Sequence, residues 1–214
     1  MSRTRAPRSM DHAALHRGVA EICARDPHLA GVVERHGPPP MWGRPPGFST
    51  LIKIILEQQV SLASAKAIYR RLQGTAGRVT AHRIARFRDA EFRLSGLTRQ
   101  KSAYCRNLAR WIVEGRLELA SLAHLEDDEV RERLVQVPGI GPWTADCYLL
   151  MALRRPDIWP SGDLALIKAA QEVRRMRRMP DGETLERIVR AWSPWRAVGA
   201  RILWHHYLSV RKKV

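Results

Sequence analysis

Residues 137–149 read V-P-G-I-G-P-W-T-A-D-C-Y-L, a short glycine turn that leads directly into a helix. Gly139 and Gly141 can adopt backbone angles that other residues avoid, and Pro142 suits the first turn of a helix. The amides of Gly139, Ile140 and Gly141, together with the helix start, can converge on an anion such as a phosphate. Two glycines also occur in ordinary turns. The pattern therefore fits either a plain interhelical turn or a phosphate-binding hairpin.

The charge of the chain favours a polyanionic partner. Its 214 residues include 37 Lys and Arg against 21 Asp and Glu, which gives a formal net charge of +16. An excess of this size is typical of proteins that bind nucleic acid. No apolar run approaches the ~20 residues of a membrane-spanning helix, so nucleic acid is favoured over a membrane. Charge alone does not separate DNA from RNA.

Length and cysteine content limit the class of protein. A chain of 214 residues suits one compact unit or two small lobes. Cys23, Cys105 and Cys147 are widely spaced, which argues against a disulfide scaffold, a zinc site and a four-cysteine iron–sulfur cluster. We therefore expect a reducing cytoplasmic environment. Residues 1–11 are basic and no apolar segment follows, which indicates a flexible tail rather than a secretory signal.

Apolar residues recur at helical spacing throughout, which predicts an all-α fold. Ser61 is expected to cap a helix, and the acidic run 126–129 to open the helix before the hairpin. Ser193-Pro194 is expected to open the last helix as a cap and a first-turn proline. The predicted helices cover residues 12–25, 29–36, 48–58, 62–73, 81–87, 99–114, 126–136, 164–174, 185–192 and 193–210, and another begins at Pro142.

Asp163, in the segment Trp159-Pro-Ser-Gly-Asp-Leu164, is the candidate catalytic residue. It follows Gly162 at the head of a predicted helix, and its apolar neighbours indicate that it faces the protein. Asp is also a common helix N-cap, so a purely structural role stays open. Six of the seven tryptophans lie at positions 111, 143, 159, 192, 195 and 204. Most are expected in the core, but an enzyme that extracts a base from DNA needs flat aromatic walls.

Five blocks of sequence together resemble the helix-hairpin-helix DNA glycosylases, and within them the 3-methyladenine DNA glycosylase II family. The blocks are 54–61 (I-I-L-E-Q-Q-V-S), 96–102 (G-L-T-R-Q-K-S), 137–145, 162–164 and 192–196 (W-S-P-W-R), and the likeness covers about residues 48–207. The resemblance implies an all-α fold of two lobes with a cleft between them. Lobe 1 would comprise residues 12–60 and 160–214, and lobe 2 residues 61–159, with the helix-hairpin-helix at 126–154.

The resemblance also assigns roles to single residues. Asp163 matches the essential aspartate at the mouth of the cleft. Gln59 matches the wedge that fills the gap left by a flipped nucleotide, and Gln58 would lie close to the extruded sugar or base. Trp143 and Trp204 match aromatic positions that flank the base pocket. The alternative for Gln58 and Gln59 is that they are polar helix-end residues facing solvent.

Further implied contacts lie in the hairpin. The residues expected to bind DNA there are Gly139, Ile140, Gly141 and Thr144. The residues whose backbone carbonyls would hold a monovalent cation, Na⁺ or K⁺, are Val135, Val137 and Ile140. No cofactor is expected for the chemistry, and no iron–sulfur cluster.

The implied activity is base excision from double-stranded DNA. A damaged, alkylated purine would be flipped out and its N-glycosidic bond hydrolysed, which leaves an abasic site. Breaking this bond builds positive charge on the sugar, and the Asp163 carboxylate would stabilise that charge and orient or deprotonate the attacking water. Purines such as 3-methyladenine and 7-methylguanine are cationic and leave readily, and stacking on an indole would help to select them.

Strand cleavage is not expected. The lyases of this superfamily carry a lysine two residues after the second hairpin glycine, and here that position is Trp143. The sequence therefore predicts a monofunctional glycosylase. We expect no extra N-terminal sheet domain of the kind that larger members have, and Cys147 stands where some relatives have an aromatic residue. The preferred lesion therefore stays open.

Two other functions remain as alternatives. One is a non-catalytic helix-hairpin-helix protein that only grips the DNA backbone, and the other is an RNA-binding protein. His205 and His206 are interpreted as packed or surface histidines, and the run 174–178 (R-R-M-R-R) as a solvated basic face that can touch phosphates. We expect a monomer that works at the nucleoid and does not bind a membrane.

Overall fold

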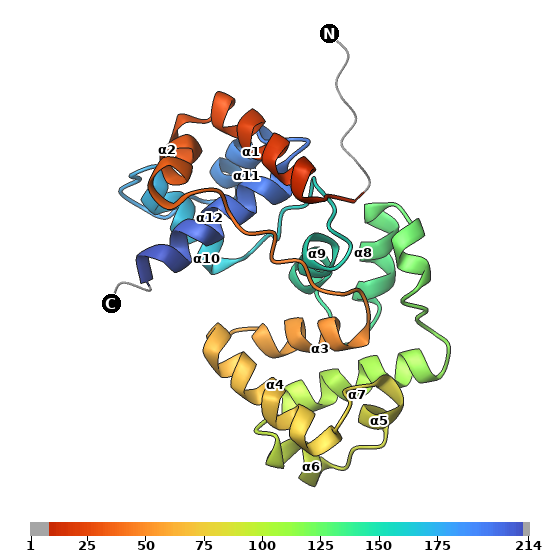
Figure 1. The fold of residues 1–214 in the computed structure, drawn as a ribbon. Helices are drawn as coiled ribbons and strands as arrows, with labels where there is room; N and C mark the ends of the chain where they lie inside the picture. The colour runs from red at the N-terminus through yellow and green to blue at the C-terminus, as the bar shows by residue number, and fades with distance from the viewer. Residues whose placement is uncertain (1–8, 212–214) are drawn as a thin grey trace. The chain divides into compact units, whose positions relative to one another are not determined.

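The structure is a computed structural model that describes residues 9–211, and those residues form helices and no strands (Figure 1). The predicted all-α class is therefore confirmed. The predicted flexible tail, residues 1–11, lies for the most part outside the described residues. It is wrong at its end, because Met10 is buried and Asp11 caps α1 (His12–Arg25) by accepting the Ala14 amide. Contacts divide the chain into two compact units, one formed by the segments up to Gly43 and from Leu153 onward, the other by Arg44–Ala152.

The boundaries of these units differ from those expected at 60/61 and 159/160. Helix α3 (Phe48–Glu57) belongs to the middle unit because it packs against α4 (Leu62–Ala76), α7 (Arg99–Val113) and α9 (Pro142–Met151). Its aliphatic side chains, Leu51, Ile52, Ile54, Ile55 and Leu56, are fully buried there. The second boundary falls directly after the end of α9.

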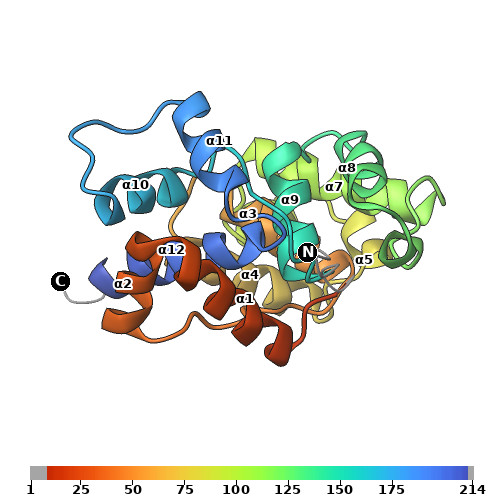
Figure 2. The same ribbon diagram turned by 90° about the horizontal axis from the view of Figure 1, so that it is seen from above.

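The first unit joins both ends of the chain. Its helices are α1 (His12–Arg25), α2 (Pro27–His36), α10 (Leu164–Val173), α11 (Gly182–Arg190) and α12 (Arg196–Arg211). Helix α12 is the central element, because α1, α2, α10 and α11 all contact it, as Figures 1 and 2 show from two directions. Trp192 and Trp195 are buried in this core.

The buried carboxylate of Asp26 connects three parts of the first unit. It accepts hydrogen bonds from the backbone amides of His28 and Leu29, at 3.1 and 3.3 Å, and so caps α2. Its second oxygen accepts the indole N–H of Trp192 at 2.8 Å and pairs with the guanidinium of Arg174. The prediction that residues 174–178 form a solvated basic face is therefore wrong for Arg174, because Arg174 is bound to Asp26.

The last helix begins later than predicted. The Ser193–Pro194 peptide is cis and precedes the helix, so this pair is not its cap and first turn. Helix α12 starts at Arg196, whose backbone amide and guanidinium Nε donate to Asp157 at 3.2 and 2.8 Å. The carboxylate of Asp157, 39 positions away in sequence, thus takes the place of the cap that was expected at Ser193.

The middle unit is continuous in sequence. Its remaining elements are α5 (Ala81–Ala85), α6 (Asp89–Leu94), the 3₁₀ turn η1 (Ser121–His124) and α8 (Asp127–Val135). Helix α6 and the turn η1 were not predicted, and α4 continues past the expected end at residue 73. The predicted cap at Ser61 is confirmed, since its hydroxyl accepts the Ser64 amide at 3.2 Å.

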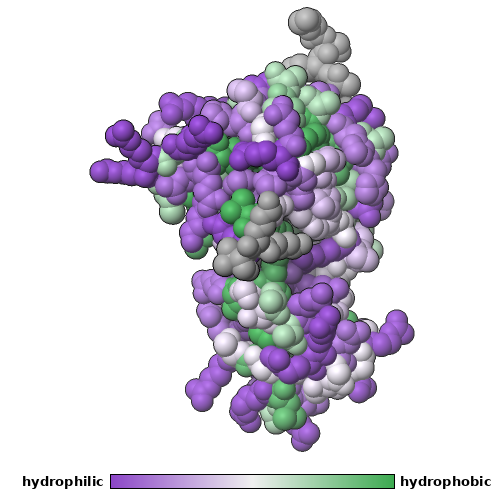
Figure 3. Space-filling view, turned by 60° about the vertical axis from the view of Figure 1, so that its left-hand side comes forward, coloured by the Kyte–Doolittle hydropathy of each residue, from purple (hydrophilic) through white to green (hydrophobic). Residues whose placement is uncertain are grey.

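Polar side chains cover most of the surface seen in Figure 3, with small apolar patches among them. Within residues 9–211, no helix is long and apolar enough to cross a membrane.

Candidate functional site

The predicted hairpin is present between α8 and α9. The amide of Ile140 donates to the carbonyl of Val137 at 2.9 Å, which closes the turn. The expectation that this amide is open to a phosphate is therefore wrong. Gly141, which is exposed, is the N-cap of α9, and Pro142 follows in the first helical turn, as predicted. The positive end of the α9 dipole thus lies at an accessible position, which is the usual geometry of an anion site.

Gly139 is required by packing within the protein. Its φ of +102° is one that residues with a Cβ avoid, and an added Cβ would collide with the ring of Tyr104. Asn107, one turn further along α7, donates from Nδ2 to the carbonyl of Pro138 at 3.4 Å. Helix α7 therefore supports the hairpin directly. Packing against α7 accounts for a glycine at this position, and the role of Gly139 in a phosphate site stays a prediction.

Gln58 also supports the hairpin. Its Nε2 donates to the carbonyl of Gly139 at 3.1 Å and to the hydroxyl of Thr144 at 3.0 Å. Thr144 is 1% exposed, so a direct contact between its side chain and DNA does not fit this burial. Both side chains thus hold the turn and the first turn of α9 together. The alternative of a solvated helix-end polar residue is wrong for Gln58.

Gln59 differs from its neighbour. It is exposed and lies in the left-handed region with a φ of +56°, at the tip of the turn between α3 and α4. The next apolar residues, Val60 and Leu62, are 40% and 53% exposed. An amide flanked by exposed apolar side chains on a short turn has the shape and chemistry of a wedge that can enter a base stack.

A buried ion pair joins the two helices of the hairpin motif. Arg131 of α8 donates from Nε to Asp146 of α9 at 2.7 Å, and from Nη1 to Asp128 at 2.6 Å. The side chain of Asp146 is 8% exposed, whereas that of Asp128 is 90% exposed. The inner pair thus joins α8 directly to α9.

Asp163 lies at the start of α10, where its Oδ1 accepts the amide of Leu166 at 2.9 Å. It follows Gly162, which has a φ of +79°, and it is half-buried, while Leu164 beside it is 63% exposed. The structural interpretation as an N-cap is therefore confirmed. A cap holds its carboxylate in one orientation at the positive end of a helix, and such a group can also act on a ligand.

The tryptophans fall into two groups. Trp192 and Trp195 are buried in the first unit, with the Trp192 ring edge-on to Trp159 at 5.8 Å between centroids. Trp143, in the first turn of α9, and Trp204, on α12, are half-buried. A half-buried indole keeps a face that a flat, cationic ring can stack on.

The histidines of α12 are packed, as predicted. Burial lowers the pKa of His206, whose Nε2 lies 3.2 Å from the Glu172 carboxylate. His205 Nε2 lies 2.9 Å from the carbonyl of His36. In the basic run, Arg175, Arg177 and Arg178 are exposed, unlike Arg174.

The carbonyls expected to hold a cation lie around the end of α8. Val135 is the last residue of this helix, and the carbonyl of Val137 already accepts the Ile140 amide, which leaves it one lone pair for an ion. Carbonyl oxygens at a helix C-terminus carry partial negative charge, and their chemistry fits a monovalent cation. Among residues 9–211 there is no group of three or more His, Cys, Asp or Glu side chains that could hold a metal.

Three supporting residues were not identified from the sequence, namely Lys101, Tyr104 and Asn107 of α7. Their spacing of three places them on successive turns of one helix, a pattern that could have marked them as one contact surface. What they contact lies far away in the sequence, which no local pattern reveals.

Comparisons with known proteins show what this chain is similar to. A DNA-3-methyladenine glycosylase of Bacillus subtilis (strain 168) is 28% identical over 174 residues, 76% of this chain. The chain spans 64% and 57% of the lengths of the two Bacillus subtilis relatives that it matches. The crystal structure of a DNA-3-methyladenine glycosidase from Bacillus halodurans is 29% identical, with a TM-score of 0.73 over 92% of this chain and 91% of that one.

A more distant neighbour shows the same fold. It is an 8-oxoguanine glycosylase/lyase from Clostridium acetobutylicum, solved with double-stranded DNA, at 19% identity and a TM-score of 0.78 over 96% of this chain and 72% of that one. The family model described as "HhH-GPD superfamily base excision DNA repair protein" matches residues 52–194, which include the hairpin, Gln58, Gln59 and Asp163. The match covers well over half of the chain, so the protein belongs to the HhH-GPD superfamily of base excision DNA repair proteins.

Proposed function

We propose that this protein is a DNA glycosylase that flips an alkylated purine out of double-stranded DNA and hydrolyses its N-glycosidic bond. The observation that carries the proposal is the half-buried carboxylate of Asp163, held at the start of α10 by the Leu166 amide, in a chain whose family match includes it. The names of the relatives from two Bacillus species support alkylated purines as the substrate class.

Asp163 acts on the sugar in this proposal. As the bond to the base lengthens, the deoxyribose gains positive charge, and a fixed carboxylate stabilises that state more than the neutral ground state. The same carboxylate orients or deprotonates the water that attacks the sugar. An alkylated purine is already cationic, so it departs with little need for an acid.

The remaining roles divide between base and backbone. Trp143 and Trp204 are the proposed aromatic surfaces for the cationic base, since both are only half-buried. Gln59 is the proposed wedge, because it is exposed at the tip of a short turn. Gly139, Gly141 and the start of α9 are the proposed phosphate site. Gln58 has two proposed roles. It supports this hairpin through its hydrogen bond to Gly139, and it lies near the extruded nucleotide.

A monovalent cation is part of the proposed phosphate site. The carbonyls of Val135, Val137 and Ile140 would hold it, and it would supply positive charge toward the DNA backbone. Affinity for duplex DNA measured in potassium chloride, and in tetramethylammonium chloride at equal ionic strength, tests this. Equal affinity in the two salts contradicts the cation site.

The central test is single-turnover base release. Duplex oligonucleotides carrying 3-methyladenine, 7-methylguanine or hypoxanthine are incubated with excess protein, and free base is measured. Asp163→Asn is expected to lower release by about 10³-fold, with duplex affinity unchanged or higher.

The matched control is Asp181→Asn, because Asp181 caps α11 through the Thr184 amide in the same way. It is expected to release base like the wild type. Full activity in Asp163→Asn contradicts the assignment. Tight binding without release by the wild type would favour the non-catalytic DNA-binding alternative.

We further propose that the enzyme is monofunctional, because Trp143 occupies the position of the lyase lysine. The same reactions are analysed for strand breaks before alkali treatment, and for protein–DNA cross-links after addition of borohydride. Neither is expected. A nick or a trapped cross-link would show that another amine of this chain forms a Schiff base with the sugar.

A further inference from the structure

Lys101 is a buried cation that the proposed mechanism does not use. Its side chain comes from α7, the residue is 8% exposed, and its Nζ donates to the carbonyl of Leu56 at 2.6 Å. Burial lowers its pKa from the ordinary lysine value. Leu56 is in the last turn of α3, where backbone carbonyls lack partners within the helix and attract positive charge.

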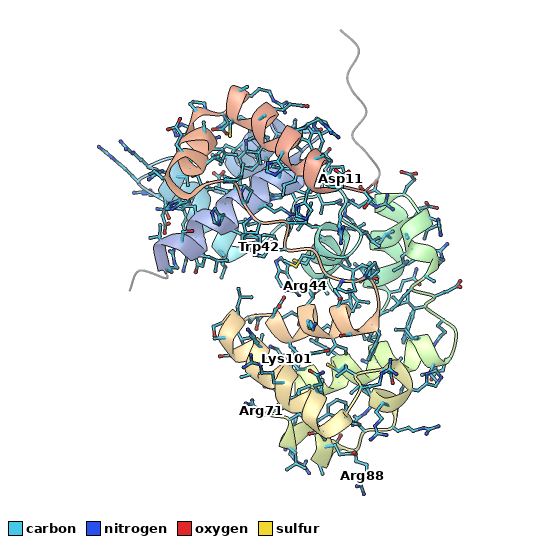
Figure 4. All side chains as sticks on the ribbon, viewed as in Figure 1. Asp11, Trp42, Arg44, Arg71, Arg88 and Lys101 are labelled. Carbon is cyan, nitrogen blue, oxygen red and sulfur yellow. The ribbon has the colours of Figure 1, made fainter. Side chains whose placement is uncertain are left out.

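The three residues before Gln59 are each held by a different segment. Leu56 is bound by Lys101, as described, and Glu57 accepts two hydrogen bonds from the guanidinium of Arg44, at 3.0 and 2.8 Å. Gln58 is bound to the hairpin at Gly139. Arg44 and Lys101, both labelled in Figure 4, lie on opposite sides of α3 in that view. Gln59 then emerges from a fixed base in the left-handed conformation.

Lys101 also couples this turn to the hairpin, because it shares α7 with Tyr104. The Tyr104 ring lies against Gly139, where it leaves no room for a Cβ, while Lys101 three positions earlier holds the end of α3. One rigid helix thus sets the spacing between the Gln59 turn and the glycine turn. All of these residues belong to the middle unit.

A buried ammonium bound to a carbonyl is a poor way to stabilise a core. Removing an ion from water is unfavourable, and apolar replacements of buried ions are often neutral or stabilising. The main contribution of Lys101 is therefore to the position of the turn that it holds, and not to the stability of the core. We propose that Lys101 is a positioning residue for the wedge: its ammonium caps α3 and holds the turn so that Gln59 can enter the gap in the DNA. This inference rests on the proposed function only for the role of Gln59.

The test uses binding rather than base release. The probes are a duplex with a tetrahydrofuran abasic analogue next to 2-aminopurine, and an undamaged duplex of the same sequence. Lys101→Met removes the ammonium and keeps an unbranched side chain. It is expected to reduce the preference for the abasic duplex by about tenfold, with less 2-aminopurine fluorescence, while affinity for the undamaged duplex is unchanged.

Two further variants separate positioning from stability. Lys53→Met is the matched control, because Lys53 lies on α3 but is directed to the Tyr69 ring, with Nζ 4.7 Å from its centroid; it is expected to keep the wild-type preference. Lys101→Arg retains a donor and a charge, and it is expected to restore most of the preference.

The decisive result comes from combination with Gln59→Ala. If Lys101 acts through Gln59, the double variant loses no more preference than Gln59→Ala alone. Additive losses would overturn the inference, as would an equal loss for both duplexes or a wild type without preference. Preference that depends on Lys101 in a protein that releases no base would overturn the proposed chemistry and leave this inference standing.

Discussion

The hairpin at 137–141 is fixed by side chains from other elements, whereas Asp163 is oriented by the backbone of the helix that it caps. Gln58 and Tyr104 hold the turn from α3 and α7, and Arg131 binds α9 from α8. Asp163 receives the Leu166 amide three residues on. The comparison shows that the proposed phosphate site depends on distant packing. The carboxylate of the proposed catalytic group accepts an amide of the helix that it begins.

The largest expected effect follows from Gly139→Ala in the hairpin. The new methyl group would collide with Tyr104 and would require a positive φ, so we expect the free energy of unfolding to fall by about 3 kcal/mol. Denaturant titration of the purified variant measures this loss. Gly141→Ala is the control, since nothing lies within 4 Å of its added Cβ.

The two glycine variants also separate packing from binding. Gly141→Ala is expected to keep wild-type stability and to weaken duplex binding, because Gly141 is exposed at the start of α9. If Gly139→Ala is as stable as the wild type, the close packing with Tyr104 is wrong. If Gly141→Ala binds DNA normally, the phosphate does not approach there.

A smaller loss is expected from Asp146→Asn, which removes one charge of the buried pair in the motif. Arg131 is partly exposed, so solvent compensates in part, and we expect the free energy of unfolding to fall by about 2 kcal/mol. Asp128→Asn removes the exposed partner of the same arginine, and it is expected to change the free energy of unfolding by less than about 0.5 kcal/mol. Equal losses in the two variants would mean that the inner pair does not hold the helices.

At the start of α10 the expected stability effect is smaller again. Asp163→Ala removes the cap and is expected to cost about 1 kcal/mol, while Asp163→Asn, which can still accept the Leu166 amide, costs almost nothing. Thermal unfolding of both variants checks this. Because both should lose base release, the pair separates capping from catalysis. Loss of stability in Asp163→Asn would show that the charge itself holds this helix.

The smallest effect concerns the basic run after α10. Replacing exposed Arg177 and Arg178 by Ala is expected to leave stability unchanged and to flatten the salt dependence of duplex binding by ~0.9 for each phosphate that the variant no longer neutralises. Arg174→Ala should instead lower stability without changing the slope, because Arg174 is bound to Asp26. Affinity titrations at several salt concentrations distinguish these outcomes. An unchanged slope in the Arg177 and Arg178 variants means that these residues do not touch DNA.

Local chemistry predicted much of the fold. The cap at Ser61, the span of α1 and the start of α9 at Pro142 follow from side chains next to one another in sequence, and all three are confirmed. Helix α6 was missed because it is short and carries the exposed Leu94. Nothing in the sequence near the Ser193–Pro194 peptide indicates that α12 begins only at Arg196, which is bound by Asp157.

The candidate site shows the same limit. Asp163 and the glycine turn could be found from sequence because each carries its own signal, a helix cap in one case and a Gly-X-Gly-Pro pattern in the other. The bond from Gln58 to Gly139 joins positions 81 residues apart, and the contact of Tyr104 with that glycine depends on the docking of α7. Such contacts are set by tertiary packing, so pattern analysis cannot supply them.

The carboxylate of Asp26 has a consequence for the order in which the protein is made. Its partners Arg174 and Trp192 leave the ribosome long after it, so these two interactions of Asp26 cannot form during most of translation. The uninterrupted segment Arg44–Ala152 is complete well before that point. We therefore expect the unit with the glycine turn to fold first on a nascent chain, and the unit with Asp163 to close only when the final helices emerge.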